Sequence, residues 1–361
     1  MKNTLLEISW ENNPLPIASK ENLNNLLEEV KTHGVVDVKK FDPQKDETYI
    51  KAFETSELPG CVICIFNSRK AMNEVLFRAS LFVETTDCKL YFTNGEYFSD
   101  DPLEAGQTYG ADRKFVDYAV GNTPAYDGIR GYDLPGKKLN AFLAKAAQDK
   151  TLPAKNQTYA AMEAEFLDFL RTLRRKYGDD YSLITSIAIP AFISITSHEF
   201  LHAQYFSDAR LRENVDEYVA SHLSDREIKL LIKCLKSSIY TTIEEDIYYR
   251  NNEIFAYMLG KNEYEDSSTR GGLFYTRALC VLKHNTPPED LTEPAADCFD
   301  AMYKAWAEND FGQGVSADKL AEISGKVFEE YKSQLPGTLD VKKGAFYKYL
   351  TAKGTAPIIV E

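Results

Sequence analysis

The chain has 361 residues, of which 44% are hydrophobic, enough to bury a large core in one large domain or two closely packed ones. Lys and Arg number 42 against 55 Asp and Glu, and the resulting net charge of -13 repels nucleic acids and anionic membrane surfaces. We therefore expect no nucleic acid among the partners of this protein.

The N-terminal sequence does not identify a compartment. Its first residues, "MKNTLLEISWENNPLP", lack the apolar core of a secretory signal. The expectation is a cytoplasmic protein, or a secreted or periplasmic one whose signal peptide has been removed.

Residues 1–137 are predicted to form a mixed α/β region with a small sheet. The sequence "NLNNLLEEVKTHG" (22–34) has the pattern of an amphipathic helix that ends at a glycine. Strand-like sequences follow at "CVICIFN" (61–67), "ASLFVETT" (79–86) and "CKLYFTNGEYF" (88–98). Cys61 and Cys64 would then point to opposite faces of a buried strand, which favours core cysteines over a disulfide or a redox pair.

The segment from residue 106 to 136 is rich in Gly, Tyr, Asp and Pro. This composition predicts a long ordered loop over a cleft, with a lid or a propeptide as its conceivable functions.

Residues 138–361 are predicted to be mainly helical. Helices are expected at 163–177, 224–237, 242–259, 293–308 and 315–333, with an extended tail at 353–361. A charge-free run at 181–197 is a marginal membrane span without a companion segment, so a buried helix is the better interpretation. We expect no stable membrane span.

The sequence "SITSHEFLHAQYFSD" (194–208) is typical of a metal site. On a helix, His198 and His202 lie one turn apart on the same face, so both imidazoles can bind one ion. Glu199 reaches the edge of the same site, where a glutamate can polarise a metal-activated water. The alternative is a pair of histidines that are solvent-facing or satisfied by hydrogen bonds.

"HEFLH" resembles the metal-binding helix of the zincin metallopeptidases. The resemblance to the gluzincin type implies a third ligand from a glutamate on a later helix, and Glu253 in "NNEIFAYM" fits, with Asn252 before it and Ala256 after it. The alternative for Glu253 is an exposed acid on a polar stripe. A metzincin-like arrangement would use Asp208 instead, but Tyr205 stands where that pattern has glycine.

The resemblance implies an α+β protein in which a mainly helical zincin-like region is catalytic. It implies Zn2+ as cofactor, a peptide or protein as substrate, Glu199 as general base and a tyrosine or histidine that stabilises the oxyanion. Tyr257 is our first candidate for that last role. Other candidates for stabilising the oxyanion are Tyr275, Arg277 and His222. Candidates for orienting the two histidines by hydrogen bonds are Asn252, Asp246 and Asp208.

Other functions stay open at this point. The motif reports water activation near a metal and does not name the bond that is cleaved, so a different zinc-dependent hydrolysis is possible. The chain could also be a catalytically inactive zincin-like protein or a helical protein-interaction module. A membrane-embedded protease would need several spans, and the sequence offers one marginal run.

Overall fold

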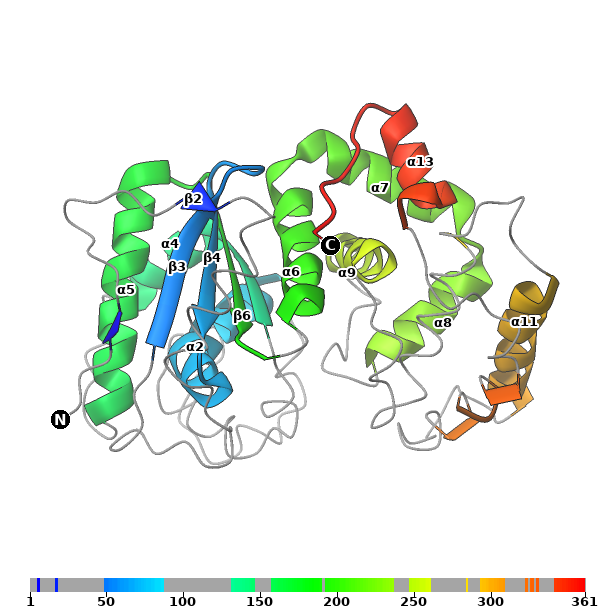
Figure 1. The fold of residues 1–361 in the computed structure, drawn as a ribbon, viewed down its shortest axis with the longest axis horizontal. Helices are drawn as coiled ribbons and strands as arrows, with labels where there is room; N and C mark the ends of the chain where they lie inside the picture. Colours follow the sequence, from blue (N-terminus) through cyan, green and yellow to red (C-terminus); the bar gives the residue numbers. More distant parts are fainter. Residues whose placement is uncertain are drawn as a thin grey trace. The chain divides into compact units, whose positions relative to one another are not determined.

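The fold combines a mixed sheet with many helices, which confirms the α+β class (Figure 1). The computed structural model describes residues 5–6, 17–18, 49–87, 131–146, 157–189, 192–236, 247–260, 284, 293–308, 322–323, 325–327, 329–330 and 341–360. The elements expected at 22–34 and 88–98 lie outside these residues, as do 106–130 and 242–246. Within the described ranges, no helix combines the length and apolar character needed to cross a membrane.

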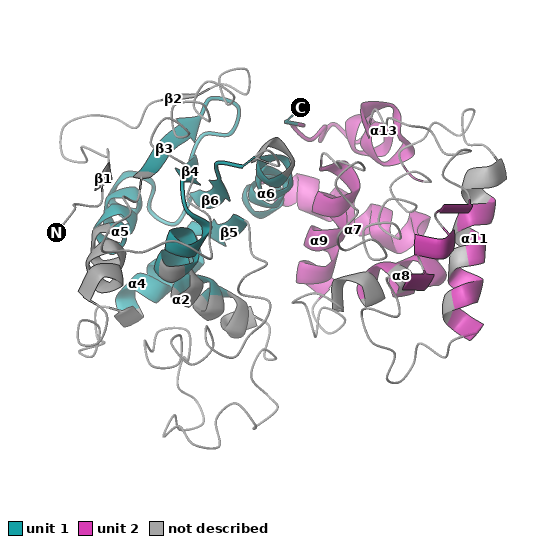
Figure 2. Cartoon of the chain, turned by 60° about the horizontal axis from the view of Figure 1, so that its bottom comes forward, with its two compact units in different colours: residues 1–207, 360–361 teal, residues 208–359 magenta. Residues whose placement is uncertain are grey.

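The chain divides into two compact units (Figure 2). Unit 1 consists of residues 1–207 with 360–361, and unit 2 of residues 208–359. The change from mixed to helical structure had been expected at residue 137, whereas the division between units follows Ser207.

Unit 1 contains the sheet. Its main strands are β3 (Tyr49–Thr55), β4 (Cys61–Phe66), β5 (Gly131–Pro135) and β6 (Ser182–Ile187). Their order is β3-β4-β6-β5, with β4 and β6 parallel and both other pairings antiparallel. The two-residue strands β1 (Leu5–Leu6) and β2 (Ile17–Ala18) each pair in parallel with β3. Strand β5 is thus the antiparallel strand at the far edge from β1.

One face of this sheet is covered by α2 (Arg69–Asp87), α4 (Gly136–Ala146) and α5 (Gln157–Tyr177). Alternate residues of each strand point into the core between the sheet and these helices, including Cys64, Tyr132 and Leu183. Cys61 and Cys64 are both buried free thiols, and Cys61 is not part of this core, as the alternation predicts. Burial raises the pKa of both thiols, so neither is a reactive thiolate.

The helix that carries the histidine motif is α6 (Phe192–Ser207), and it packs on β6 and β5. Gly131 of β5 lies against Ile195 and Glu199 of α6, whereas its neighbour Tyr132 donates a hydrogen bond to Asn73 on α2. Because successive strand residues point to opposite faces, α6 lies on the sheet face opposite α2.

Three expectations for unit 1 are wrong. Residues 79–86 continue α2 instead of forming a strand, because Ala79 and Val83 lie one turn apart on the buried face of a helix. Residues 181–197 are not one buried helix, since they contain β6 before α6 begins. The segment 106–136 is not a loop throughout, since it ends in β5 and the first residue of α4.

The described part of unit 2 is helical. It contains α7 (Ala209–His222), α8 (Asp225–Lys236), α9 (Ile247–Leu259), α11 (Glu293–Glu308), the 3-10 helix η6 (Val341–Lys343) and α13 (Ala345–Ala352). The positions of α8 and α11 confirm the helices predicted at 224–237 and 293–308.

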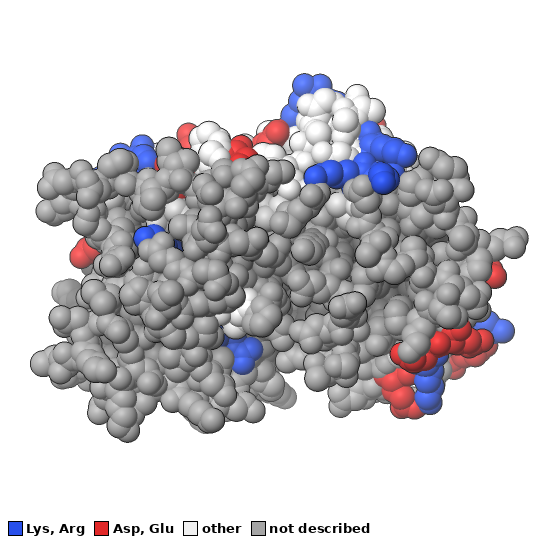
Figure 3. Space-filling model, in the orientation of Figure 1, with Lys and Arg blue, Asp and Glu red and all other residues white. Residues whose placement is uncertain are grey.

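In Figure 3, Lys and Arg side chains gather over η6 and α13, and Asp and Glu side chains gather near α11.

A buried chain of polar side chains connects α7 and α8 through residue 284. The Nδ1 atom of His284 lies 3.1 Å from the Tyr218 hydroxyl, and its Nε2 lies 2.8 Å from Oε1 of Glu227. The other oxygen of Glu227 accepts hydrogen bonds from the amide and hydroxyl of Ser224. Ser224 and Glu227 therefore form a capping box at the start of α8, and its glutamate also contacts a buried histidine.

Candidate metal centre

His198 and His202 lie on one face of α6, as their spacing predicts. Their Nε2 atoms are 3.0 Å apart, and the two rings meet edge to face with centroids 4.6 Å apart. His202 is only 1% exposed, and its helix also buries Phe200, Leu201 and Ala203. The apolar residues of the motif thus fix α6 against its surroundings, while the histidines bring two nitrogen atoms together.

The separation of these nitrogen atoms suits a shared metal ion. Two nitrogens that each bind a tetrahedral zinc ion at about 2.0–2.1 Å lie about 3.3 Å from each other. The observed 3.0 Å is close to this value. Neutral imidazole is also the form of histidine that binds zinc.

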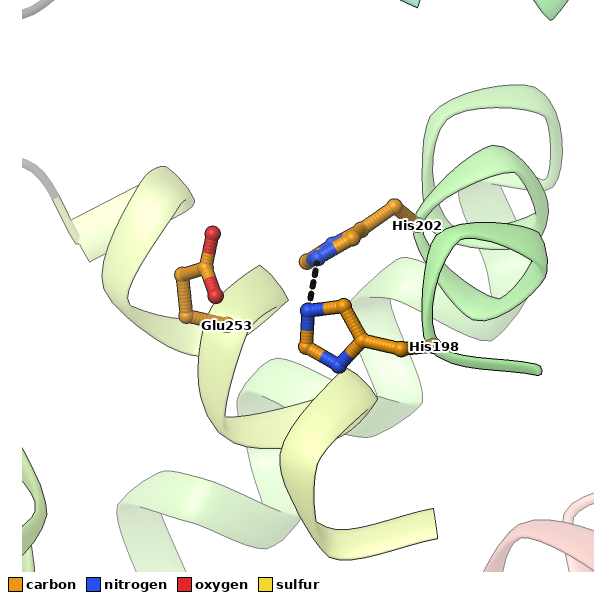
Figure 4. Close-up of side chains that lie close together, drawn as sticks. All are labelled: His198, His202 and Glu253. Carbon is orange, nitrogen blue, oxygen red and sulfur yellow. Dashed lines mark hydrogen bonds between the residues drawn. The ribbon is translucent and has the colours of Figure 1, made fainter. Parts of the chain in front are cut away.

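Glu253 lies on α9 and is 4% exposed. His198, His202 and Glu253 each offer a ligand atom, and these atoms lie within 4.8 Å of one another. Figure 4 shows the carboxylate and the two rings turned toward one another. Asn251 and Asn252, which precede Glu253 on α9, are buried too. The interpretation of Glu253 as an exposed acid on a polar stripe is therefore wrong. Glu253 belongs to unit 2, and its role as third ligand is therefore a proposal.

Asp208, the competing third ligand, has another function. It is the exposed N-cap of α7, and its Oδ1 accepts hydrogen bonds from the amides of Arg210 and Leu211 at 2.9 and 3.0 Å. An aspartate at this position satisfies amides that the first turn of a helix leaves without partners. The carboxylate of Asp208 thus stabilises α7, and the groups of possible metal ligands among the described residues do not include it.

Glu199 is 8% exposed, and its carboxylate lies against strand β5. Its Oε1 lies 2.6 Å from the position that a Cβ atom on Gly131 would occupy. The side chain of Asp133 makes a hydrogen bond with Glu199. Asp133, Glu199 and His202 form a second group whose possible ligand atoms lie within 4.8 Å of one another. Asp133 is not among the predicted site residues, because it lies in a segment whose Gly, Asp and Pro residues predict a loop.

The environment of Asp133 favours its protonated form. Burial raises the pKa of its carboxyl group to about 8, although hydrogen bonds from its own backbone and with Glu199 act in the opposite direction. Two carboxyl groups in hydrogen-bond contact need a proton between them, because a carboxylate can only accept.

The remaining site predictions have different outcomes. Tyr257 packs beside Ile232 and Ile228 of α8, and its catalytic role stays a prediction. His222 is exposed and stacks on Tyr218, with ring centroids 4.7 Å apart and planes 2° from parallel. Tyr275, Arg277 and Asp246 lie outside the described residues.

The residues at hand fit a zinc ion. Two imidazoles and a carboxylate are the ligand set of many catalytic zinc sites, in which the fourth position is left for water or substrate. Glu199, which follows His198, gives the site a carboxylate in addition to these three ligands.

No protein-family model matches the chain, and no curated protein or solved structure shows significant similarity to it. The chemistry of these side chains is therefore the basis of a functional proposal.

Proposed function

We propose that this protein is a zinc-dependent metallopeptidase in which His198, His202 and Glu253 hold the metal and Glu199 is the general base. The main support is the 3.0 Å approach of the two Nε2 atoms on α6, with the Glu253 carboxylate among the atoms within 4.8 Å. The resemblance of "HEFLH" to the zincin metallopeptidases supplies the reaction class, hydrolysis of a peptide bond.

Each side chain has a distinct task in this proposal. The two imidazoles bind in their neutral form, and the carboxylate of Glu253 offsets part of the charge of a divalent cation. When bound, zinc supplies a Lewis acid that makes water a better nucleophile near neutral pH. Glu199 takes a proton from the attacking water and gives it to the leaving amine.

The burial of the carboxylates favours this chemistry. Glu253 is 4% exposed and Glu199 is 8% exposed, so water screens their charges weakly. A buried carboxylate is costly unless a cation or a hydrogen bond compensates it. Tyr257 lies one turn after Glu253 on α9 and stays our candidate for stabilising the oxyanion.

The test compares wild type with Glu199→Gln and His198→Ala, all purified without a histidine tag. Zinc is measured by plasma mass spectrometry after the metal is added back and excess removed. Hydrolysis is measured with fluorescence-quenched peptide libraries and with labelled casein. Glu213→Gln is the matched control, because Glu213 is an exposed glutamate on α7.

We expect about one zinc per chain in wild type, Glu199→Gln and Glu213→Gln, and little in His198→Ala. Hydrolysis should fall by about 10²- to 10⁴-fold in Glu199→Gln and stay unchanged in the control. 1,10-Phenanthroline should abolish it, whereas the non-chelating 1,7-isomer should not. Wild type that binds no zinc, or Glu199→Gln that cleaves like wild type, would contradict the proposal and favour an interaction module.

A further inference from the structure

A second group of metal-binding side chains lies entirely within unit 1. Asp133 of β5 and the α6 residues Glu199 and His202 each offer a ligand atom, and these three atoms lie within 4.8 Å of one another. The group shares His202 with the proposed zinc site, whose third ligand, Glu253, belongs to unit 2. The geometry of the second group therefore depends only on how α6 packs on β5 within one folded unit.

Strand β5 makes room for both carboxyl groups of this second group. Tyr132 and Leu134 belong to the core under α2. The alternate residues Gly131 and Asp133 therefore point to the opposite face of the sheet, on which α6 packs. On that face, a Cβ atom at position 131 would lie 2.6 Å from Oε1 of Glu199, so the glycine leaves the space that this carboxyl group fills.

The ligand atoms of the second group differ in kind from those of the proposed zinc site. Two carboxyl groups and one imidazole supply two oxygens and one nitrogen, whereas the zinc site has two nitrogens and one oxygen. Oxygen ligands suit harder ions such as Mn2+, and imidazole nitrogens suit zinc. Asp133 is partly exposed, so a hydrated ion can reach the group from solvent and keep water among its ligands.

We propose that Asp133, Glu199 and His202 form a second divalent-cation site, whose oxygen-rich ligands suit Mn2+. A cation in this site binds Glu199, which is then no longer available to take a proton from water. Mn2+ should therefore inhibit hydrolysis. This consequence rests on the proposed peptidase function, whereas binding of the ion does not.

The first test measures Mn2+ binding in a protein whose zinc site is incomplete. His198→Ala lacks one ligand of the zinc site and keeps all three residues of the second site. Mn2+ is titrated into the metal-free protein at pH 7, and the free ion is measured by electron paramagnetic resonance. His198→Ala should bind about one Mn2+ per chain.

Asp133→Asn, added to His198→Ala, keeps the shape of the side chain and removes its negative charge. It should weaken Mn2+ binding by at least about 10-fold, the smallest loss that removal of an outer partner of a metal site typically causes. Asp168→Asn in the same background is the matched control, because Asp168 is an exposed aspartate on α5, and it should change nothing. Thermal unfolding identifies any variant that has lost its fold.

A second measurement needs no substitution. Electron spin echo spectra of Mn2+ bound to metal-free wild type report the imidazole nitrogens that bind the ion directly. One such nitrogen is expected, from His202. Two nitrogens would place Mn2+ between His198 and His202, and none would exclude His202, so either result would overturn the inference.

The outcomes separate this site from the peptidase proposal. If His198→Ala binds no Mn2+, or binds it equally well with Asp133→Asn, the second site is wrong, and zinc binding with hydrolysis by wild type leaves the peptidase function standing. If wild type cleaves no probe but Asp133→Asn weakens Mn2+ binding, the cation site stands without that function. In zinc-loaded protein that cleaves, Asp133→Asn should raise the inhibiting Mn2+ concentration by the same factor as its binding constant. Hydrolysis that continues at saturating Mn2+ would remove Glu199 from the site.

Discussion

The Nε2 atoms of His198 and His202 lie 3.0 Å apart on α6. Two imidazole nitrogens that face each other this closely must share a proton or a cation. Glu199 follows the first histidine and is held by β5, so the same turn of helix presents both possible ligands and a possible base. The metal, its third ligand and the base can therefore be tested separately.

The third ligand is the first prediction. Glu253→Ala should weaken zinc binding by at least about 100-fold, more than the loss of an outer hydrogen-bond partner typically causes. Asp208→Ala should keep wild-type zinc affinity, because its carboxylate accepts hydrogen bonds from the amides of Arg210 and Leu211. Competition titration with a chromophoric chelator measures both affinities.

Asp208→Ala has a second readout that serves as its control. Removal of an aspartate N-cap costs about 1 kcal/mol of folding free energy, so its denaturation midpoint should fall. A stable Asp208→Ala protein that has lost its zinc would reverse the assignment and make Asp208 the ligand.

Gly131→Ala is the second prediction. The added Cβ would lie 2.6 Å from Oε1 of Glu199 and 2.8 Å from the carbonyl oxygen of Thr185, which is backbone and cannot move aside easily. Displacement of a reacting group by about 1 Å can cost about 10²-fold in rate. We expect hydrolysis to fall by about that factor while zinc content stays unchanged.

The same variants should be compared by thermal unfolding, because the Thr185 contact also strains the sheet. A Gly131→Ala protein with a lowered melting temperature but full hydrolytic activity would show that Glu199 does not depend on this contact. Loss of zinc would instead place Gly131 among the residues that shape the metal site.

The histidine pair was predictable because its signal is local. Residues four apart on a helix share a face whatever the rest of the fold does, so "HEFLH" already defines the geometry of its two nitrogens. Asp133 was not predictable, because it approaches Glu199 through the pairing of β5 with β6 and the packing of α6 on both strands. Its sequence neighbours, Gly131 and Pro135, indicate a turn when they are considered alone.

The errors in the predicted secondary structure have the same cause, because long-range packing decides between helix and strand in these segments. Residues 182–187 are buried on both faces of the sheet, so "SLITSI" lacks the alternation that distinguishes a strand from a buried helix. The β-branched and aromatic residues of 79–86 favour a strand by propensity, but Ala79 and Val83 are buried one turn apart in α2, which packs against α4 and α5. In β5, Tyr132 and Leu134 alternate with Gly131, Asp133 and Pro135, and the structure buries Tyr132 and Leu134 and leaves the other three residues partly exposed.

The third prediction concerns the buried chain in unit 2. Tyr218→Phe removes one hydrogen bond to Nδ1 of His284 and should cost about 0.5–1.5 kcal/mol. His284→Leu also removes the donor to Oε1 of Glu227, which is buried, and should cost about 1–3 kcal/mol more. Urea denaturation of both variants measures the difference. Equal costs would mean that Glu227 does not depend on His284.

The last prediction concerns stability at low pH and tests the link between β3 and α5. Glu54 accepts hydrogen bonds from Lys176 and Tyr177 at the end of α5 and from the amide of Gly60. Burial alone would raise the pKa of Glu54, but these hydrogen bonds and the charge of Lys176 outweigh it and hold the pKa below its ordinary value of 4.5. The folded state thus favours the charged carboxylate.

The sign of the pH effect follows from this difference in pKa. The unfolded chain binds a proton at Glu54 at a higher pH than the folded chain does, so this stabilisation is complete well above pH 4.5 and is lost as the pH falls through the lowered value. Glu54→Gln should therefore be less stable than wild type at pH 7, by about 1 kcal/mol. The two proteins should converge in acid.

Denaturation midpoints in urea between pH 3 and pH 7 measure this convergence. The exposed Glu213→Gln variant is the matched control, and its stability should follow that of wild type at every pH. A constant difference between Glu54→Gln and wild type over this range would show that shape and packing at the end of α5, rather than the charge of Glu54, connect it to β3.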